Sequence, residues 1–129
     1  MKTENNYSLS AHNTFGIDAR CRQFVEYETV DELRDFISCR LVDVASETSL
    51  PLLHIGGGSN LLFTTDFQGI VLHSAIKGVE VEMSDAARQE VVVKAGAGEN
   101  WDDFVARCVE QGYYGLENLS YIPGEVGAS

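Results

Sequence analysis

The feature that most restricts this sequence is a glycine triplet directly after a short apolar run. The run from Leu50 to Ile55 is typical of a buried strand, and Gly56–Gly58 ends it abruptly. Successive glycines let a ligand come close to bare backbone N–H groups, and consecutive N–H groups in a turn form a concavity that binds anions. Ser59 and Asn60 add side-chain donors at the rim. The stretch predicts a diphosphate-binding loop or, as the alternative, a ligand-free connection between strands.

The triplet does not match the two common phosphate-binding signatures. A P-loop needs a Lys-Ser/Thr pair after its last glycine, and none follows Gly58. The dinucleotide fingerprint G-x-G-x-x-G would need a glycine where Leu61 stands, and a helix after it. A turn-prone stretch, residues 64–69, follows instead. The residues therefore predict a cradle built from a loop rather than from a helix N-terminus.

Composition argues against several classes of function. The net charge of −11 repels phosphate backbones, so we expect no nucleic-acid partner. Cys21, Cys39 and Cys108 are widely spaced, which favours reduced thiols over a disulfide frame or a metal site. Met1–Ser10 lacks the apolar core of a signal peptide, and no apolar run approaches the ~20 residues that cross a bilayer. We expect a cytoplasmic protein without metal or membrane insertion.

Hydrophobic periodicity predicts two parts after a flexible, polar N-terminus at residues 1–12. The first part has strands at 24–29, 50–55 and 69–73, in a partly parallel sheet. A capping box, Thr29-x-x-Glu32, starts its helix, whose buried face is predicted to be Val30, Leu33, Phe36, Ile37 and Leu41. The second part has an antiparallel hairpin at 78–83 and 90–95. A helix capped by Asn100 follows and stops at Gly112, with an apolar face of Trp101, Phe104, Val105 and Cys108.

No residue qualifies as a catalytic acid, base or nucleophile. His12, His54 and His73 are far apart in sequence, and His54 alternates with apolar neighbours as a core or edge histidine would. The stretch Gly57–Asn60 lacks the second glycine of a G-x-S-x-G nucleophile elbow. The sequence predicts binding chemistry without a catalytic group.

Four segments, taken together, match one enzyme family in order and spacing. They are Asn13–Ile17 (NTFGI), Ile55–Leu62 (IGGGSNLL), Gly96–Trp101 (GAGENW), and GLENL at 115–119 followed by IPGEVG at 122–127. From about residue 13 to its last residue, the chain resembles the N-terminal part of the UDP-N-acetylenolpyruvoylglucosamine reductases, also called UDP-N-acetylmuramate dehydrogenases. One glycine-rich motif would be weak evidence, whereas four in register are specific.

The resemblance implies an α+β fold, the two-subdomain FAD-binding domain of the vanillyl-alcohol oxidase or PCMH type. It divides the chain into a flexible N-terminus (1–12), a first α/β subdomain (13–75) and a partial second subdomain (76–129). Because the sequence stops inside a second glycine-rich loop, we expect a chain truncated in the second subdomain, with the C-terminal substrate domain absent.

The resemblance also implies a reaction. Such enzymes bind FAD non-covalently, use NADPH as co-substrate, and reduce a UDP-linked enolpyruvyl amino sugar to UDP-N-acetylmuramate for peptidoglycan. The family's catalytic residues lie beyond residue 129, so this chain carries none of them and is expected to be inactive alone. Two alternatives stay open: another non-covalent FAD oxidoreductase of the same superfamily, and a non-catalytic nucleotide-binding module.

By position, the resemblance assigns cofactor contacts to two loops. The first loop is assigned to the FAD pyrophosphate and comprises Ile55, Gly56, Gly57, Gly58, Ser59, Asn60, Leu61 and Leu62. The second is assigned to the flavin and comprises Ile122, Pro123, Gly124, Val126, Gly127, Ala128 and Ser129. Glu125, inside the second loop, receives no role.

Overall fold

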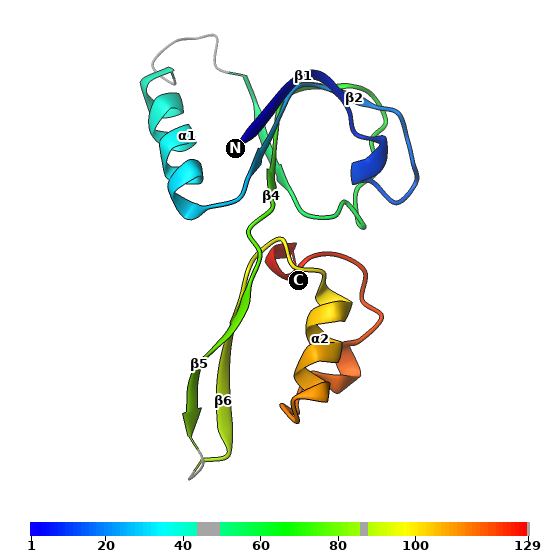
Figure 1. Cartoon of the computed structure of the whole chain (residues 1–129). Helices are drawn as coiled ribbons and strands as arrows, with labels where there is room; N and C mark the ends of the chain where they lie inside the picture. The colour runs from blue at the N-terminus through cyan, green and yellow to red at the C-terminus, as the bar shows by residue number, and fades with distance from the viewer. Residues whose placement is uncertain (44–49, 86–87, 129) are drawn as a thin grey trace.

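The computed structural model describes residues 1–43, 50–85 and 88–128. The elements are β1 (Lys2–Ser8), η1 (Ser10–His12), β2 (Arg20–Tyr27), α1 (Val30–Asp43), β3 (Leu52–Ile55), β4 (Phe67–Ser74), β5 (Val79–Asp85), β6 (Glu90–Ala95), α2 (Trp101–Glu110), η2 (Glu117–Leu119) and η3 (Val126–Ala128). Figure 1 shows strands β1–β4 with α1 in one part, and the β5–β6 hairpin with α2 in another. No helix in the described ranges is long and apolar enough to cross a membrane.

The first part is built on a four-stranded sheet in the order β1-β2-β4-β3. β2, β4 and β3 run parallel, and β1 pairs antiparallel with β2 at the edge. The predicted partly parallel layer is therefore confirmed. Because parallel strands end at the same edge, the last residues of the three strands, Tyr27, Ile55 and Ser74, lie at one edge of the sheet. The sheet ends at Ser74 and β5 begins at Val79, so the boundary predicted at residues 75 and 76 falls in this connection and stays a prediction.

The expectation of a flexible N-terminus is wrong. Lys2–Ser8 forms β1, which pairs with β2 from Lys2 opposite Glu26 to Ser8 opposite Arg20. Tyr7 stacks on Phe24 with 4.4 Å between the ring centroids, and Leu9, just after the strand, is fully buried. Most side chains of β1 are exposed because the strand lies at an edge. The polar sequence of β1 does not reveal this strand, which is stabilised by backbone pairing, by the partly buried Tyr7 and by the buried Leu9 that follows it.

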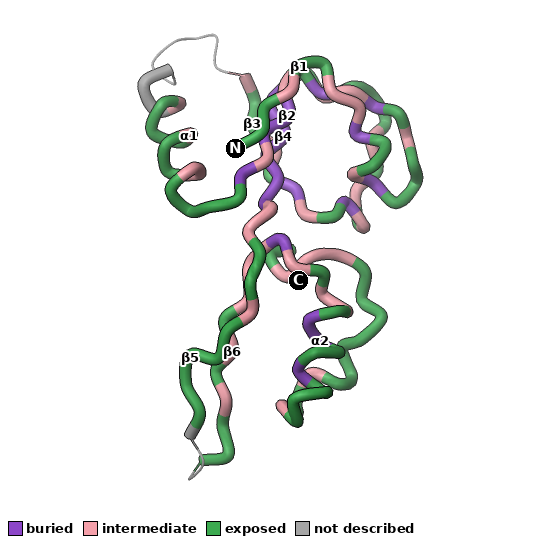
Figure 2. Tube along the Cα trace, in the orientation of Figure 1, coloured by how far each residue is buried: buried purple, intermediate pink, exposed green. Residues whose placement is uncertain are grey.

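Two apolar clusters lie on opposite faces of the sheet. One contains Leu9, Cys21, Phe24, Ile55 and Val71, and the segments around η1 and Phe63 cover it. The other contains Val25, Tyr27, Ile70 and Leu72, and α1 covers it with Leu33 and Phe36. Figure 2 shows the buried residues concentrated along these central strands.

Helix α1 begins where the sequence predicts but is buried less than predicted. Thr29 Oγ1 accepts a hydrogen bond from the Glu32 N–H at 3.1 Å, and the Glu32 carboxylate reaches back to the Glu28 N–H at 2.7 Å. The predicted buried face is wrong for Val30 and Ile37, which are 51% and 41% exposed. The apolar patch beneath the helix is small, and Leu33 and Phe36 already cover it. Leu41's side chain lies outside the described residues.

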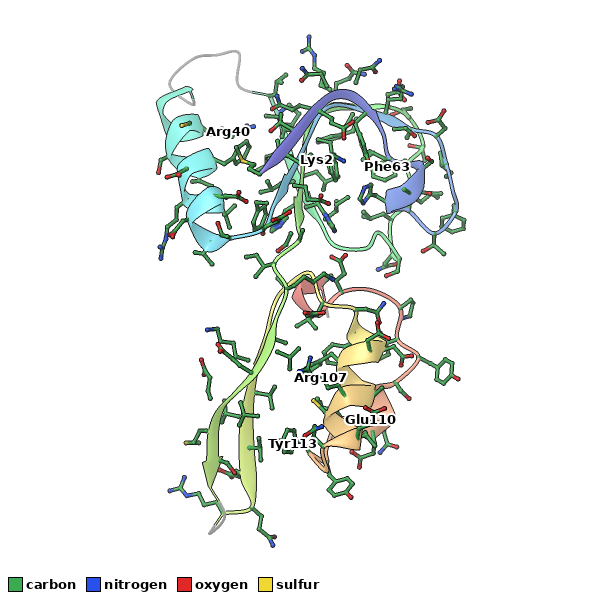
Figure 3. The ribbon with its side chains drawn as sticks, viewed as in Figure 1. Lys2, Arg40, Phe63, Arg107, Glu110 and Tyr113 are labelled. Carbon is green, nitrogen blue, oxygen red and sulfur yellow. The ribbon has the colours of Figure 1, made fainter. Side chains whose placement is uncertain are left out.

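The second part confirms the predicted hairpin and capped helix. β5 and β6 pair antiparallel, and Asn100 Oδ1 accepts from the Asp103 N–H at 3.0 Å to start α2. The helix buries Phe104, Val105 and Cys108 and is followed by Gly112 at φ +75°. Arg107 and Tyr113 lie between α2 and the hairpin (Figure 3), where they line a pocket of about 170 Å³.

Candidate cofactor-binding site

The structure brings the two predicted loops together, although about sixty residues separate them in sequence. Ser59 Oγ in the first loop donates a hydrogen bond to the carbonyl of Pro123, 64 residues further along the chain in the second loop, at 3.0 Å. A Cβ added at Gly56 would lie 2.8 Å from the Ala128 Cβ. The C-terminal segment crosses the edge of the sheet at which the parallel strands end (Figure 1). The loops therefore form one site between the two parts of the chain.

A pocket of about 190 Å³ opens between the loops. Its lining consists of His54, Ile55, Gly56, Ser74, Ala97, Glu125, Gly127 and Ala128. Sites that hold whole small ligands occupy roughly 300–1,000 Å³. This pocket therefore suits one segment of an extended ligand, such as the diphosphate of a dinucleotide.

The backbone of the first loop offers unused donors. Among the described residues, none accepts a hydrogen bond from the N–H groups of residues 57–60, the second and third glycines with Ser59 and Asn60. Backbone N–H groups rarely go without a partner when they are shielded from water, and Gly58 is buried. Four consecutive N–H groups with free hydrogens match the predicted anion cradle. The N–H groups of residues 57–60 are therefore chemically suited to bind a diphosphate.

Gly57 and Gly58 are glycines for different physical reasons. A Cβ at Gly57 would find nothing nearer than 3.8 Å, so a side chain there would project into the space between the loops. A Cβ at Gly58 would lie 1.9 Å from the His12 carbonyl oxygen, and Gly58 has φ +69°. Gly58 is therefore required by the fold itself, whereas only a ligand would require Gly57 to be small.

The segment behind Gly58 is held by Asn13, which belongs to the NTFGI segment at 13–17. Asn13 is buried, and its side-chain amide donates to the carbonyls of Leu9 (2.7 Å) and Ile17 (3.0 Å). Its Oδ1 accepts from the Ile17 N–H at 2.9 Å. Next to it, the Thr14 N–H donates to the Gly58 carbonyl at 3.4 Å. Asn13 therefore shapes the surface against which the glycine loop packs.

We expect Asn13→Ala to lower the free energy of unfolding by about 2–3 kcal/mol, because it removes three hydrogen bonds and strands buried backbone groups. Urea unfolding followed by circular dichroism measures the loss. Asn60→Ala is the matched control, because Asn60 is exposed, and should change the same quantity by less than about 0.5 kcal/mol. Equal losses in the two variants would contradict this role for Asn13.

In the second loop, backbone N–H groups donate hydrogen bonds to carbonyls of the protein itself. Val126 donates to the Glu99 carbonyl at 2.9 Å and Gly127 donates to the Ala97 carbonyl at 2.8 Å, while the Trp101 N–H donates to the Gly124 carbonyl at 3.1 Å. The loop is thus tied to the segment 96–101, another of the four sequence motifs. Any contact of Val126 or Gly127 with a ligand would come from atoms other than these N–H groups.

The remaining predicted site residues differ in exposure. Leu61 packs against the core around Phe24, whereas Leu62 and Ile122 are 64% and 45% exposed. Ser129 lies outside the described residues. The glycines with Ser59, Pro123 and Ala128 thus form the centre of the site, and these apolar side chains lie around it.

Two of the three histidines, His54 and His73, lie at this edge of the sheet. The His54 Nε2 lies 3.0 Å from the Tyr27 hydroxyl. His73 lies between Glu26 and Glu125, and its ring is 5.2 Å from that of His12. Burial first, and then the nearby His73, lower the pKa of both His12 and His54. The sequence alone does not predict that Glu26, His73 and Glu125 lie together, because the two glutamates are 47 and 52 residues from His73.

The lowered pKa values of His12 and His54 predict an acid-sensitive fold. Below the ordinary value of 6.5, the unfolded chain binds more protons at these two side chains than the folded chain does. Their contribution to stability is present above pH 6.5 and is lost as the pH falls below it. Urea unfolding between pH 7.5 and 5 should show this fall, and the double variant His12→Asn/His54→Gln should flatten it. A slope unchanged in that variant would contradict the assignment.

Comparison with known proteins adds a family. The profile described as "FAD binding domain" matches residues 22–129. The chain is similar to proteins named UDP-N-acetylenolpyruvoylglucosamine reductase. It shares 56% sequence identity with one from Bacteroides fragilis, in an alignment that covers 98% of this chain and 36% of the relative. In Porphyromonas gingivalis the identity is 46%, over 100% of this chain and 36% of the relative. This chain therefore spans about a third of the length of the curated relatives it matches.

The solved structures agree on the fold. The crystal structure of the UDP-N-acetylenolpyruvylglucosamine reductase from Thermus caldophilus superposes on this chain with a TM-score of 0.67. The identity is 24%, and the alignment covers 98% of this chain and 40% of that one. This likeness confirms the α+β fold, and the family match covers both glycine-rich loops as far as residue 129. The chain belongs to the FAD-binding domain family.

Proposed function

We propose that this chain is the FAD-binding part of a UDP-N-acetylenolpyruvoylglucosamine reductase. The observation that carries the proposal is the 56% identity over 128 residues with a protein of that name. The two apposed loops support it, because the first carries unused N–H donors of the kind that bind a diphosphate. FAD, when bound, would supply the hydride transfer between NADPH and the enolpyruvyl group of a UDP-linked amino sugar. The product, UDP-N-acetylmuramate, would serve peptidoglycan synthesis in the cytoplasm.

This chain's own residues would bind and orient the cofactor. The N–H groups of residues 57–60 would hold the diphosphate, and Ser59 would keep the second loop in place through Pro123. The apolar side chains of Leu62 and Ile122 are exposed near the loops and would shield part of the bound ligand from water. We expect the chain by itself to bind FAD without catalysing turnover.

The test is an FAD titration followed by flavin fluorescence, with Gly57→Asp as the decisive variant. The Cβ of an aspartate at Gly57 would meet nothing nearer than 3.8 Å, and its charge would lie beside the diphosphate. We expect saturable binding by the wild-type chain and binding weakened on the order of 100-fold in the variant. Gly58→Asp would be a poor probe, because the clash with His12 would disturb the fold as well.

The matched control is Gln68→Glu, which adds the same charge at the opposite end of β4. It should bind FAD as the wild-type chain does, and Gly57→Asp should keep the circular dichroism spectrum of the folded wild-type chain. Absence of saturable FAD binding by the wild-type chain would overturn the assignment of a diphosphate site to these loops.

A further inference from the structure

His73 joins two carboxylates that come from different parts of the chain. Its Nδ1 lies 2.9 Å from Glu26 Oε2 on β2, and its Nε2 lies 3.0 Å from Glu125 Oε1 in the second loop. The His73 side chain is only 10% exposed, and those of Glu26 and Glu125 are 27% and 18% exposed. The three side chains form a bridge from the central sheet to the loop, largely shielded from water.

The hydrogen-bonding of this bridge requires an extra proton. A neutral imidazole has one N–H, whereas ionised carboxylates only accept. Two hydrogen bonds from His73 therefore need either the doubly protonated ring or a proton on one carboxyl group. Among the described residues, the rings that pack against His73 are those of Phe24 on β2 and His12 on η1, and neither carries a fixed positive charge. The lowered pKa values of His12 and His54 favour the neutral form of both neighbours.

Glu125 lies where an anionic ligand would be repelled. A Cβ added at Gly56 would be 3.5 Å from the Glu125 Oε2, and one added at Gly57 would be 3.8 Å from its Cγ. Glu125 also lines the pocket between the two loops. An uncompensated carboxylate at this distance from a diphosphate would oppose binding strongly in a partly buried site.

We propose that His73 is a positioning residue that neutralises Glu125 and holds the second loop over the glycine loop, so that an anionic dinucleotide can bind between them. The inference rests on the proposed FAD site and adds residues that neither the sequence motifs nor the comparisons assign. Glu26, which accepts from the other ring nitrogen, fixes the orientation of the imidazole. The bridge makes the charge of Glu125 compatible with its place in the site.

The test compares FAD affinity in His73→Gln, Glu125→Gln and the double variant. We expect His73→Gln to bind FAD on the order of ten-fold more weakly, because Glu125 is left with its charge. Glu125→Gln should bind at least as tightly as the wild type, since a glutamine carries no charge and its amide N–H can donate to His73 Nε2. The double variant should recover most of the loss, because the repelling charge is gone. Effects that simply add, with no recovery in the double variant, would overturn the proposal.

Two measurements without FAD separate this proposal from the proposed function. Nitrogen-15 spectra of the histidine rings should show the Nε2 of His73 hydrogen-bonded to a carboxylate in the wild-type chain, and this signature should be lost in Glu125→Gln. A double-mutant cycle in urea unfolding should give a coupling between His73 and Glu125, and no coupling between His73 and the α2 residue Glu110 in a control cycle with Glu110→Gln. Absence of that hydrogen bond together with no coupling would refute the bridge even if FAD binds. A coupled pair in a chain that binds no FAD would refute the proposed function instead.

Discussion

Gly58→Ala is expected to lower the free energy of unfolding by about 3 kcal/mol or more. The new Cβ would lie 1.9 Å from the His12 carbonyl oxygen and 2.6 Å from its carbonyl carbon, so backbone would have to move. The residue also has φ +69°, where a side chain is strained. Because small domains are stable by only about 5–15 kcal/mol, a loss of this size is a large share of the total. Urea unfolding followed by circular dichroism measures it.

Gly57→Ala is the matched control for this prediction. It makes the same chemical change one residue away, but its Cβ would meet nothing nearer than 3.8 Å and its φ is not in the left-handed region. We expect a change of less than about 1 kcal/mol. If both variants lost equal stability, flexibility of the glycine triplet as a whole, and not packing of Gly58 on His12, would explain the glycines.

Phe24→Ala is expected to lower the free energy of unfolding by about 3–5 kcal/mol, the usual range for removing a buried phenylalanine. Phe24 is 1% exposed on β2, and its ring centroid lies 4.4 Å from that of Tyr7 and 4.6 Å from that of His12. The cavity would open between the sheet and the N-terminal segment that supports Gly58. We therefore expect FAD binding to weaken in the same variant, as the titration described above would show.

The control for Phe24→Ala is Phe15→Ala. Phe15 is 67% exposed, so the same truncation leaves no cavity and should change stability by less than about 0.5 kcal/mol. A small loss for Phe24→Ala would mean that the N-terminal segment does not pack on β2 in solution. A large loss of stability for Phe15→Ala would mean that the ring of Phe15 packs against another surface in solution.

The predicted elements that the structure confirms are those whose causes are local in sequence. Thr29 and Asn100 cap their helices through hydrogen bonds to N–H groups three residues ahead. The hairpin strands alternate apolar and polar residues over a few positions, as a half-exposed strand does. Such signals need no knowledge of distant residues, so the sequence is sufficient to find them.

The failures have a different cause. β1 is polar and was predicted to be flexible, because its stability comes from pairing with β2 and from Tyr7 and Leu9 packing on residues further along the chain. Helix α1 has a regular apolar stripe, yet Val30 and Ile37 stay exposed because the apolar patch of the sheet beneath it is small. Periodicity reports which side chains could be buried, and the partner surface decides which are.

The candidate site shows the same division. The glycine triplet with Ser59 and Asn60 predicted a loop cradle from residue types alone, since bare N–H groups in a turn bind anions wherever the turn occurs. The apposition of this loop with residues 122–128, the support of Gly58 by His12 and the bridge from Glu26 through His73 to Glu125 are tertiary. They join segments 46 or more residues apart, and the order of the parallel strands brings those segments to one edge of the sheet.

The sequence by itself determined the local elements and the chemistry of the first loop. Only the tertiary structure decided which glycine the fold requires and how a glutamate is held in an anion site, because both depend on close contacts between residues that the chain keeps far apart.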